Sequence, residues 1–488
     1  MVGDDEPEEQ AESETKRAET LIRELERDIV VQGLLPGHKI GEESQLARRF
    51  GLSRSVAREA IAIGEWEGFL ENRRGRNGGL YVAAPSAEVA VYAVRNYLFL
   101  SGTTLDDIIG CRDLLERPLL ELAMRRARPE QIDHLATLLE EQGGEVGSRL
   151  HIGQLKTFVD ELSQAANLPP LTIFSAALRH CYVDRTRVSD LDDARYRRVA
   201  LKVVKIRQKQ VEAVISLDFA TALALHVEAL KLWRGFHAHP PVGTSTEAEM
   251  VQRLVQPDPA TPIYEFVRQV KKSEAIARVI SQRIADAGLM AGDRLGTEAE
   301  LMQQMQAGRG GLREAIRILE RYGIVEPARG KRGGLAVAEP KIEALLRVTQ
   351  RFLLAGYAKE PNAYLSLTRM LLREGTRNAA ALFGHRTGCE DAARLFPPSF
   401  DFRAPPSVQM KQWGQAVAHL CHDRALRCFI LIMVELVCMR PDEREWPSFG
   451  EDVAPDMARL FDSIATGDAI WAPRQSDRLF ECMWPIDH

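Results

Sequence analysis

The sequence lacks the features that would place the chain in a membrane, in a secreted fold or in a common class of enzyme. It has no apolar run long enough to span a bilayer and no charged-then-apolar leader. Its seven cysteines form no CxxC pair and lack zinc-finger histidine spacing, so we expect reduced thiols in a protein of the cytoplasm. The motifs GxxxxGKS/T, HExxH and GxSxG are also missing, which argues against an enzyme.

The chain also lacks a large excess of charge of either sign. A formal net charge of −5 does not exclude nucleic acid, because binding depends on local charge and not on the sum. Acidic side chains are concentrated in residues 1–14, which we expect to be a solvated, disordered tail. The 488 residues give room for about three or four domains, each able to bury its own core.

One segment of the sequence occurs twice. LSRSVAREAI from Leu52 and RRGRNGGLYV from Arg73 return as AGRGGLREAI from Ala307 and ARGKRGGLAV from Ala328. The offset is constant at about 255 residues and about two positions in five are identical, so the pattern indicates duplicated domains and not solenoid repeats.

Each copy has the element order of a helix-turn-helix. In the first copy a short helix at about Glu43–Phe50 leads through Gly51-Leu52-Ser53 into another helix, for which Ser53 is a suitable N-cap. Arg54 and Arg58 are four residues apart on the outward face of that helix, near its start, where recognition helices meet base edges. A guanidinium group there can bond guanine O6 and N7 together, or it can hold a phosphate.

A basic, glycine-rich tip between two short predicted strands, Phe69–Glu71 and Leu80–Val82, completes the first copy. Glycines let the backbone approach phosphate closely, and arginines supply contacts that release counterions. The candidate DNA-binding residues of the first copy are Arg54, Ser55, Arg58, Arg74, Gly75 and Arg76. Those of the second copy are Arg309, Arg313, Arg329, Gly330 and Lys331.

Two simpler interpretations of these residues stay open. Arg58 and Arg313 could pair with glutamates on a solvated helix face, and the tips could be ordinary hairpin turns. Paired arginines, turn spacing and a basic tip recur together in both copies, and this recurrence favours DNA binding.

Apolar spacing and linker composition predict the rest of the organisation. The regions after the two motifs repeat apolar residues at helical spacing, and a stretch rich in proline separates the halves, with room for a short helix at Glu247–Leu254. The predicted fold class is mainly α, with two winged helix-turn-helix domains, each followed by an all-α helical bundle. The predicted parts are the tail 1–14, the winged helix 15–85, the bundle 86–236, the linker 237–263, the winged helix 264–340 and the bundle 341–488.

The repeated unit resembles the DNA-binding domain of the GntR family of bacterial transcription regulators, and the helical parts look like the FCD effector domain of its FadR-like branch. Family members normally carry one winged helix and dimerise on a palindromic operator, so this chain looks like two protomers fused. The resemblance implies DNA contacts from Arg54, Arg58 and Gly75 in the first copy, and from Arg309, Arg313 and Gly330 in the second.

The two copies depart from the family pattern in ways that make them unequal. A further family arginine is Ser44 in one copy and Ala299 in the other, so that contact is expected to be lost. Gly308, Gly310 and Gly311 leave the second recognition helix without an obvious cap, and we expect it to fray. An operator with two unlike half-sites follows from this difference.

The resemblance also bears on small ligands of the helical parts. Many FCD domains bind a divalent metal through one Asp and three His, a donor set that is not present here, so neither a metal nor a cofactor is expected. The matching positions are Leu155, Val159, Arg207 and Ala229, and in the second copy Met410 and Gly414. Arg112 matches an arginine that can hold a ligand carboxylate, and Arg369 is its counterpart; a helix-surface or inter-helix ion pair is an equally open interpretation. His226 lies near these positions and is expected to be a satisfied core or surface histidine.

Together these observations predict a non-enzymatic, sequence-specific transcription regulator, a repressor that acts as a single-chain pseudo-dimer in the cytoplasm, at the bacterial nucleoid. Its partners would be double-stranded DNA with two half-sites and a small carboxylate or acyl metabolite bound by the helical parts. Whether two whole chains form a homodimer stays open. The alternative is an architectural or competitor protein that binds DNA and senses no effector.

Overall fold

The structure is a computed structural model of the chain. It describes residues 17–18, 20–22, 24–25, 28–29, 34, 36–66, 68–73, 75, 78–140, 159–185, 193–237, 246–256, 271–287, 289, 291–321, 324–328, 334–338, 342–384, 404–439 and 454–483. The predicted tail therefore lies outside the described residues, as do 238–245 and 257–263 of the predicted linker.

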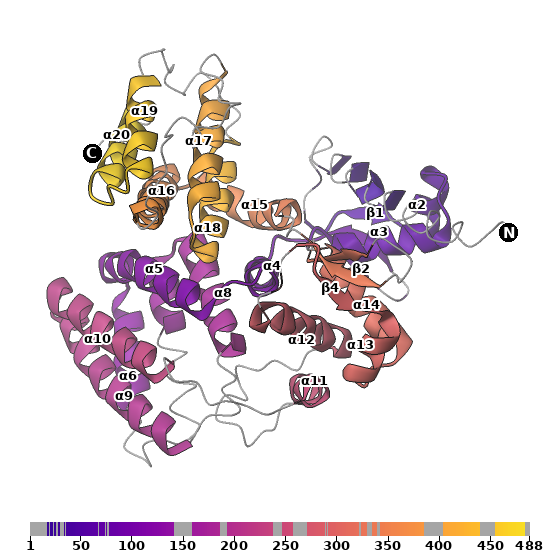
Figure 1. The fold of residues 1–488 in the computed structure, drawn as a ribbon, viewed down its shortest axis with the longest axis horizontal. Coiled ribbons are helices and arrows are strands. Elements are labelled where there is room, and N and C mark those ends of the chain that lie inside the picture. The colour runs from indigo at the N-terminus through magenta and orange to yellow at the C-terminus, as the bar shows by residue number, and fades with distance from the viewer. Residues whose placement is uncertain are drawn as a thin grey trace. The chain divides into compact units, whose positions relative to one another are not determined.

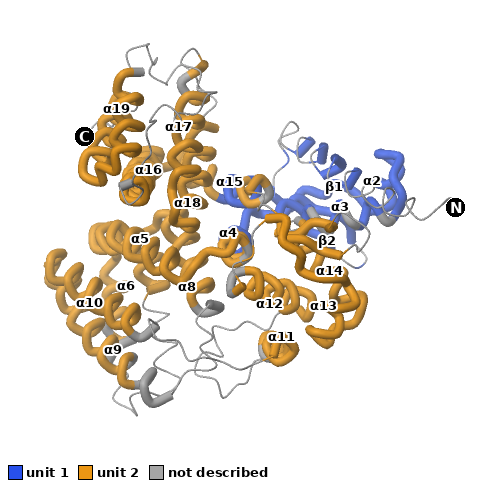
Figure 2. The backbone as a smooth tube through the Cα atoms, viewed as in Figure 1, with its two compact units in different colours: residues 1–93, 347–352 blue, residues 94–346, 353–488 orange. Residues whose placement is uncertain are grey.

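The described part of the chain is mainly helical and contains two small three-stranded sheets, and this confirms the predicted fold class (Figure 1). The chain divides into two compact units (Figure 2), residues 1–93 with 347–352, and residues 94–346 with 353–488. The boundaries of the smaller predicted domains stay a prediction.

The first winged helix combines helices with an antiparallel sheet of strand order β1-β3-β2. Its elements are β1 (Lys39–Gly41), α2 (Glu43–Arg49), α3 (Arg54–Trp66), β2 (Leu70–Arg73) and β3 (Gly79–Val82). Leu21, Leu25 and Ile61 pack in one apolar core with Phe69 and Leu80. Burying such side chains contributes about 1.5–3 kcal/mol each relative to exposure, which fixes α3 against the sheet. The predicted short helix and both predicted strands are confirmed.

The second winged helix repeats this arrangement, with strand order β4-β6-β5. Its elements are α12 (Lys272–Asp286), β4 (Arg294–Gly296), α13 (Glu298–Gln304), α14 (Arg309–Arg321), β5 (Val325–Pro327) and β6 (Leu335–Val337). The same glycine conformation recurs where β1 and β4 bulge, with φ of 149° at Gly41 and 131° at Gly296. Left-handed φ values of this kind are open to glycine and strained for other residues, so the bulge accounts for glycine in both copies.

The short helix predicted inside the linker is also confirmed, as α11 (Glu247–Val255). Thr246 caps it, since the Thr246 hydroxyl accepts a hydrogen bond from the Glu249 amide and the Glu249 carboxylate accepts one from the Thr246 amide. α11 packs against α12 of the second winged helix.

Two sets of helices make up most of the remaining chain. The first set is α4 (Ala87–Leu100), α5 (Leu105–Arg126), α6 (Pro129–Glu140), α8 (Pro169–Arg185), α9 (Asp193–Ile215) and α10 (Phe219–His237). The second set is α15 (Glu343–Tyr357), α16 (Pro361–Gly384), α17 (Pro406–Leu420), α18 (Arg424–Val437), α19 (Ala454–Ala465) and α20 (Trp471–Met483). The helix α18 is apolar around nearly its whole circumference, and it lies against α16, α17 and α5 (Figure 1).

The two sets of helices meet in the second compact unit through positions that are equivalent in the two halves. Phe174 of α8 stacks on Phe429 of α18, 255 positions later, with ring centroids 4.2 Å apart and an interplanar angle of 11°. Arg424 donates hydrogen bonds to the carbonyl oxygens of Ser101 (2.9 Å) and Gly102 (2.8 Å). With the same offset of 255 positions, Ser101 corresponds to Gly356, and Arg424 corresponds to Pro169. These two residues also lie close together, since a Cβ built on Gly356 would lie 3.1 Å from Pro169 Cγ. Matching contacts in both directions are typical of an isologous interface around a two-fold axis.

Candidate nucleic-acid interface

The recognition helix of the first copy, α3, has the predicted orientation. Ser53 begins it, and the Ser53 hydroxyl accepts a hydrogen bond from the Val56 amide at 3.3 Å. Ala57 is buried on the inward face, whereas Arg54 and Arg58 are exposed. The backbone of Ser55 belongs to α3, but its side chain lies outside the described residues.

The second guanidinium of each recognition helix pairs with a glutamate on the preceding helix. Arg58 Nε donates to Glu43 Oε1 at 2.8 Å, and Arg313 Nε donates to Glu298 Oε2 at 3.4 Å. The arginine side chains are nevertheless 70% and 58% exposed. The structure thus contains the predicted alternative, an ion pair on a solvated helix face, and it also leaves both guanidinium groups accessible to a ligand.

The first tip, between β2 and β3, is described only in part. Gly75 is exposed, has a φ of 107°, and a Cβ built on it would have no heavy atom within 4 Å, so its backbone is open to a ligand. Arg74 and Arg76 lie outside the described residues, as do Arg329, Gly330 and Lys331 of the second tip. The roles of these five residues stay a prediction.

Two cations, Arg73 and Lys39, lie beside the first tip, and the sequence analysis missed Lys39. The guanidinium carbon of Arg73 is 4.3 Å from the centroid of the Tyr81 ring, and Lys39 Nζ is 6.0 Å from the same centroid. Lys39 and Tyr81 are paired between β1 and β3, so pairing across the predicted sheet could have indicated this cluster. The second copy has Ala336 opposite Arg294 at the corresponding pair, so no aromatic ring stands at that position.

Three of the four residues 308–311 at the start of the second recognition helix are glycines, Gly308, Gly310 and Gly311. A Cβ built on Gly308 or Gly310 would have no heavy atom within 4 Å, and one on Gly311 would lie 3.8 Å from Ile276 Cδ1, an ordinary contact distance. None of the three glycines has a positive φ. The fold therefore does not require glycine at these positions, and Arg309 stands exposed between two of them.

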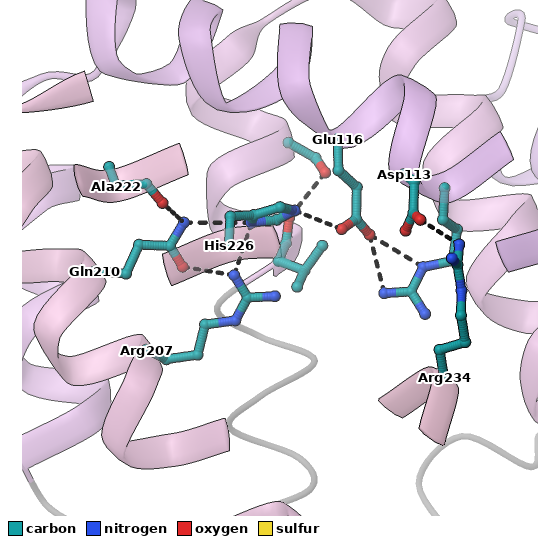
Figure 3. A network of polar contacts seen from close by, with 10 residues as sticks. Asp113, Glu116, Arg207, Gln210, Ala222, His226 and Arg234 are labelled. Atoms are coloured by element: carbon teal, nitrogen blue, oxygen red, sulfur yellow. Dashed lines mark hydrogen bonds and ion pairs between the residues drawn. The ribbon is translucent and has the colours of Figure 1, made fainter. Parts of the chain in front are cut away.

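A network of buried polar side chains occupies the first set of helices (Figure 3). Glu116 of α5 accepts hydrogen bonds from Arg112 (Nη2, 2.9 Å) and pairs with His226 Nε2 of α10 at 2.6 Å. On its other side, the His226 ring approaches Arg207 of α9, with 2.7 Å between Nδ1 and Nη1. Gln210 accepts from Arg207 at 2.5 Å. Burial alone would raise the pKa of Glu116, but Arg112 and the bond from His226 hold that pKa well below its usual range.

The charge states in this network follow from its donors. A guanidinium group can only donate, so His226 Nδ1 must accept from Arg207, and the ring proton is on Nε2, facing Glu116. Burial and the neighbouring Arg207 lower the pKa of His226, which agrees with a neutral ring. His226 is therefore a satisfied core histidine, as expected from the sequence.

This arrangement does not fit a divalent metal. Arg207 places a cation against the only imidazole of the network, and Val159 and Ala229 offer no ligand atoms. Leu155 lies outside the described residues. In the part of the chain that the structure describes, no group of three or more His, Cys, Asp or Glu side chains could hold a metal ion.

The two arginines predicted to face an effector are both engaged with carboxylates. Arg112 is bound to Glu116, and Arg369 of α16 donates to Asp477 of α20 at 3.0 Å and to Glu481 at 2.5 Å. An ion pair is thus present at both positions, within α5 for Arg112 and between α16 and α20 for Arg369, while an effector role stays a prediction. Separately, no helix within the described ranges has the length and apolar character needed to cross a membrane.

Comparisons with known proteins agree with the winged-helix geometry. The chain matches the family described as "Bacterial regulatory proteins, gntR family" twice, over residues 17–82 and 272–334. It is 25% identical over 264 residues to RmpR of Mycobacterium gastri, which is described as a putative HTH-type transcriptional regulator. This match covers 49% of this chain and 93% of RmpR.

Other relatives are similar over shorter stretches. The Uxu operon regulator of Haemophilus influenzae is 26% identical over 132 residues, and YdhC of Bacillus subtilis, an uncharacterized HTH-type transcriptional regulator, is 32% identical over 129 residues. These matches span 47% and 48% of the two relatives, about half their length. Among solved structures, Streptococcus agalactiae GntR is 18% identical with a TM-score of 0.30, and the match covers 45% of this chain and 99% of that one. E. coli McbR/YncC is also 18% identical, with a TM-score of 0.25, and the match covers 46% of this chain and 97% of that one.

Proposed function

We propose that this chain, which carries two DNA-binding domains of the GntR family, is a sequence-specific transcription regulator that reads both halves of an operator with one chain. Its mode of action is repression, by occupying DNA in the nucleoid of the bacterial cytoplasm. It catalyses no reaction.

The observation that carries the proposal is the recurrence of exposed arginines at equivalent places on α3 and α14. Arg54 and Arg58 on one helix, and Arg309 and Arg313 on the other, lie in the first two turns of helices that begin 255 residues apart. Side chains at the start of a recognition helix reach base edges in the major groove, where arginine bonds guanine in two places. Two such helices in one chain suit two half-sites.

The contact between the two sets of helices supports the single-chain pseudo-dimer. Phe174 and Phe429 are equivalent positions stacked on each other, and the Ser101–Arg424 contact has its counterpart in Gly356–Pro169. In a homodimer the same contacts would join two chains. Here both partners are present in one chain, so pairing occurs at an effective concentration of about a millimolar without a second copy.

The test is selection of bound DNA from a random duplex pool by the full chain, followed by footprinting of the enriched duplexes. We expect a bipartite site with two half-sites that differ in sequence, because α3 starts with Ser53-Arg54-Ser55 and α14 with Gly308-Arg309-Gly310. Enrichment of a single half-site per chain would contradict the two-reader account. Enrichment of no sequence would contradict sequence-specific regulation altogether.

A second part of the proposal is that the first set of helices binds a small carboxylate or acyl metabolite. The supporting observation is an excess of buried positive charge around Glu116. Arg179 is bonded to Asp160 through Nη2, yet its buried Nη1 has no hydrogen-bond partner among the described residues, and Arg112 and Arg207 also surround the Glu116 carboxylate. An added carboxylate would satisfy that group and offset the charge.

A thermal-shift series with acetate, dicarboxylates and acyl-coenzyme A compounds tests the metabolite part. A rise in the unfolding temperature that Arg179→Ala abolishes would support it. A flat response to the whole panel, in a chain that still selects DNA, would favour the alternative of a DNA-binding architectural or competitor protein without an effector.

A further inference from the structure

The same ion pair joins the two helices of the helix-turn-helix in both copies. Glu43 is the first residue of α2 and Glu298 the first residue of α13, and each carboxylate accepts from the arginine 15 positions later on the recognition helix. In both pairs the donor is Nε and not a terminal nitrogen of the guanidinium group. We propose that Glu43 and Glu298 are positioning residues that orient Arg58 and Arg313 toward DNA bases.

The nitrogen that bonds the glutamate determines which N–H groups of the arginine remain free to bond a base. A guanidinium group has five N–H donors in a planar fork, and a bond at Nε uses only one of them. Nη1 and Nη2 of Arg58 remain available to bond guanine O6 and N7 side by side. A carboxylate bound at the terminal nitrogens would instead block that edge. The pair therefore fixes the plane of the group and leaves its base-reading edge open.

The glutamates are themselves held in place by the helices that carry them. α2 starts with a capping box, in which the Glu42 amide donates to Gln45 Oε1 at 2.8 Å, and Leu46 of the same helix is buried in the core. α13 has the corresponding box between Thr297 and Glu300. A fixed helix start gives Glu43 a fixed place, and Glu43 can transmit it to a long, flexible arginine.

A carboxylate on the proposed DNA-facing surface lowers the affinity for DNA unless it also orients a base-reading arginine. A negative charge beside the phosphate backbone weakens binding to every duplex, whatever its sequence. Two glutamates at equivalent places thus lower general affinity, while an oriented arginine raises discrimination between sequences. The inference rests on the proposed function and adds to it the groups that set specificity.

The experiment compares two duplexes with the full chain: the duplex most enriched by the wild-type chain, and a scrambled duplex of the same composition. For Glu43→Ala we expect a loss of about fivefold to tenfold on the enriched duplex, part of the discrimination that a bidentate arginine supplies. On the scrambled duplex we expect unchanged or slightly tighter binding, because a charge that repels phosphate is gone. Glu43→Gln should restore most of the loss, since its amide oxygen can accept from Arg58 Nε.

A double-mutant cycle separates positioning from a structural role. In an Arg58→Ala background, Glu43→Ala should have no further effect on the enriched duplex, because the glutamate acts through that arginine. Glu298→Ala should give the same pattern with a smaller amplitude, since its bond to Arg313 is longer, 3.4 Å against 2.8 Å. Glu24→Ala, on the helical segment before β1, is the matched control and should leave the ratio of the two affinities unchanged.

Two results would overturn the inference while leaving the proposed function intact: equal losses on both duplexes, or additive losses in the double mutant. If the wild-type chain enriches no duplex, the proposed function fails, and the positioning role fails with it.

Discussion

The exposed arginines of α3 and α14 are the residues on which the proposed DNA reading depends. Arg54→Ala and Arg313→Ala should each cost about 1–3 kcal/mol of specific binding and relax the sequence preference at one half-site, because each removes a guanidinium group that bonds a base edge or phosphate. Titration of selected and half-site-mutated duplexes measures this. Arg125→Ala, which removes an exposed arginine of α5 paired with Glu121, is the control. Wild-type affinity in both recognition-helix variants would show that α3 and α14 do not read the DNA.

The buried carboxyl group of Asp423 should make the stability of the protein depend on pH. Its side chain caps α18 by accepting from the Leu426 amide at 2.8 Å, and it lies against Cys111 of α5, so burial raises its pKa from 3.8 to about 7. The folded chain then holds a proton that the unfolded chain releases above about pH 4. The stabilisation from the neutral carboxyl group is therefore present at low pH, and it is lost as pH rises from about 4 to about 7.

The matching variant is Asp423→Asn, which keeps an oxygen for the helix cap but cannot ionise. Its unfolding temperature should fall less than that of the wild type between pH 5 and pH 8, because the wild type loses up to about 1.4 kcal/mol for each pH unit in its window. Differential scanning calorimetry of both proteins measures the difference. Parallel pH profiles would show that Asp423 does not titrate in this range.

Sequence reasoning identified the exposed arginines but not the groups that they contact. Arg54 and Arg58 could be predicted because paired cations, the turn spacing and a basic tip recur in two places. Glu43 could not be assigned to Arg58, because the crossing geometry of α2 and α3 decides which side chains meet. The network around Glu116 was missed for the same reason, since its members come from α5, α9 and α10.

At the scale of elements, the constant offset predicted most of the winged-helix architecture. α3 and α14 have 13 residues each and begin at equivalent positions, because the pattern of apolar and turn residues recurs with the same spacing. The helical parts were less predictable. α9 has 23 residues and its counterpart α19 has 12, a difference that helical periodicity alone does not reveal.

The glycine-rich start of α14 can be stabilised without altering the packing of the helix. Gly308→Ser supplies a cap like Ser53, and Gly310→Ala adds a better helix former, in space where a built Cβ meets no heavy atom within 4 Å. Gly308→Ser should stabilise the helix start by only about a few tenths of a kcal/mol, and Gly310→Ala by about 0.5–1 kcal/mol. Hydrogen exchange of the amides in the first two turns of α14 should slow in the double variant. Unchanged or faster exchange would show that the glycines are needed by the fold.

At the scale of the whole molecule, the matching contacts between the two sets of helices support the proposal that one chain can occupy both half-sites. The stacking of Phe174 on Phe429 could not be predicted from sequence, because it needs the two halves to be placed around a common axis. Their equivalence in the repeat becomes meaningful only when the rings are found 4.2 Å apart. A surface already used within the chain is not available for pairing with a second chain.

The mass of the complex between the full chain and a selected duplex with two half-sites tests this account most directly. Native mass spectrometry over a range of protein concentrations should show one chain of 54.6 kDa on each duplex, with both half-sites protected in a parallel footprint. Two chains on each duplex, one for each half-site, would contradict it.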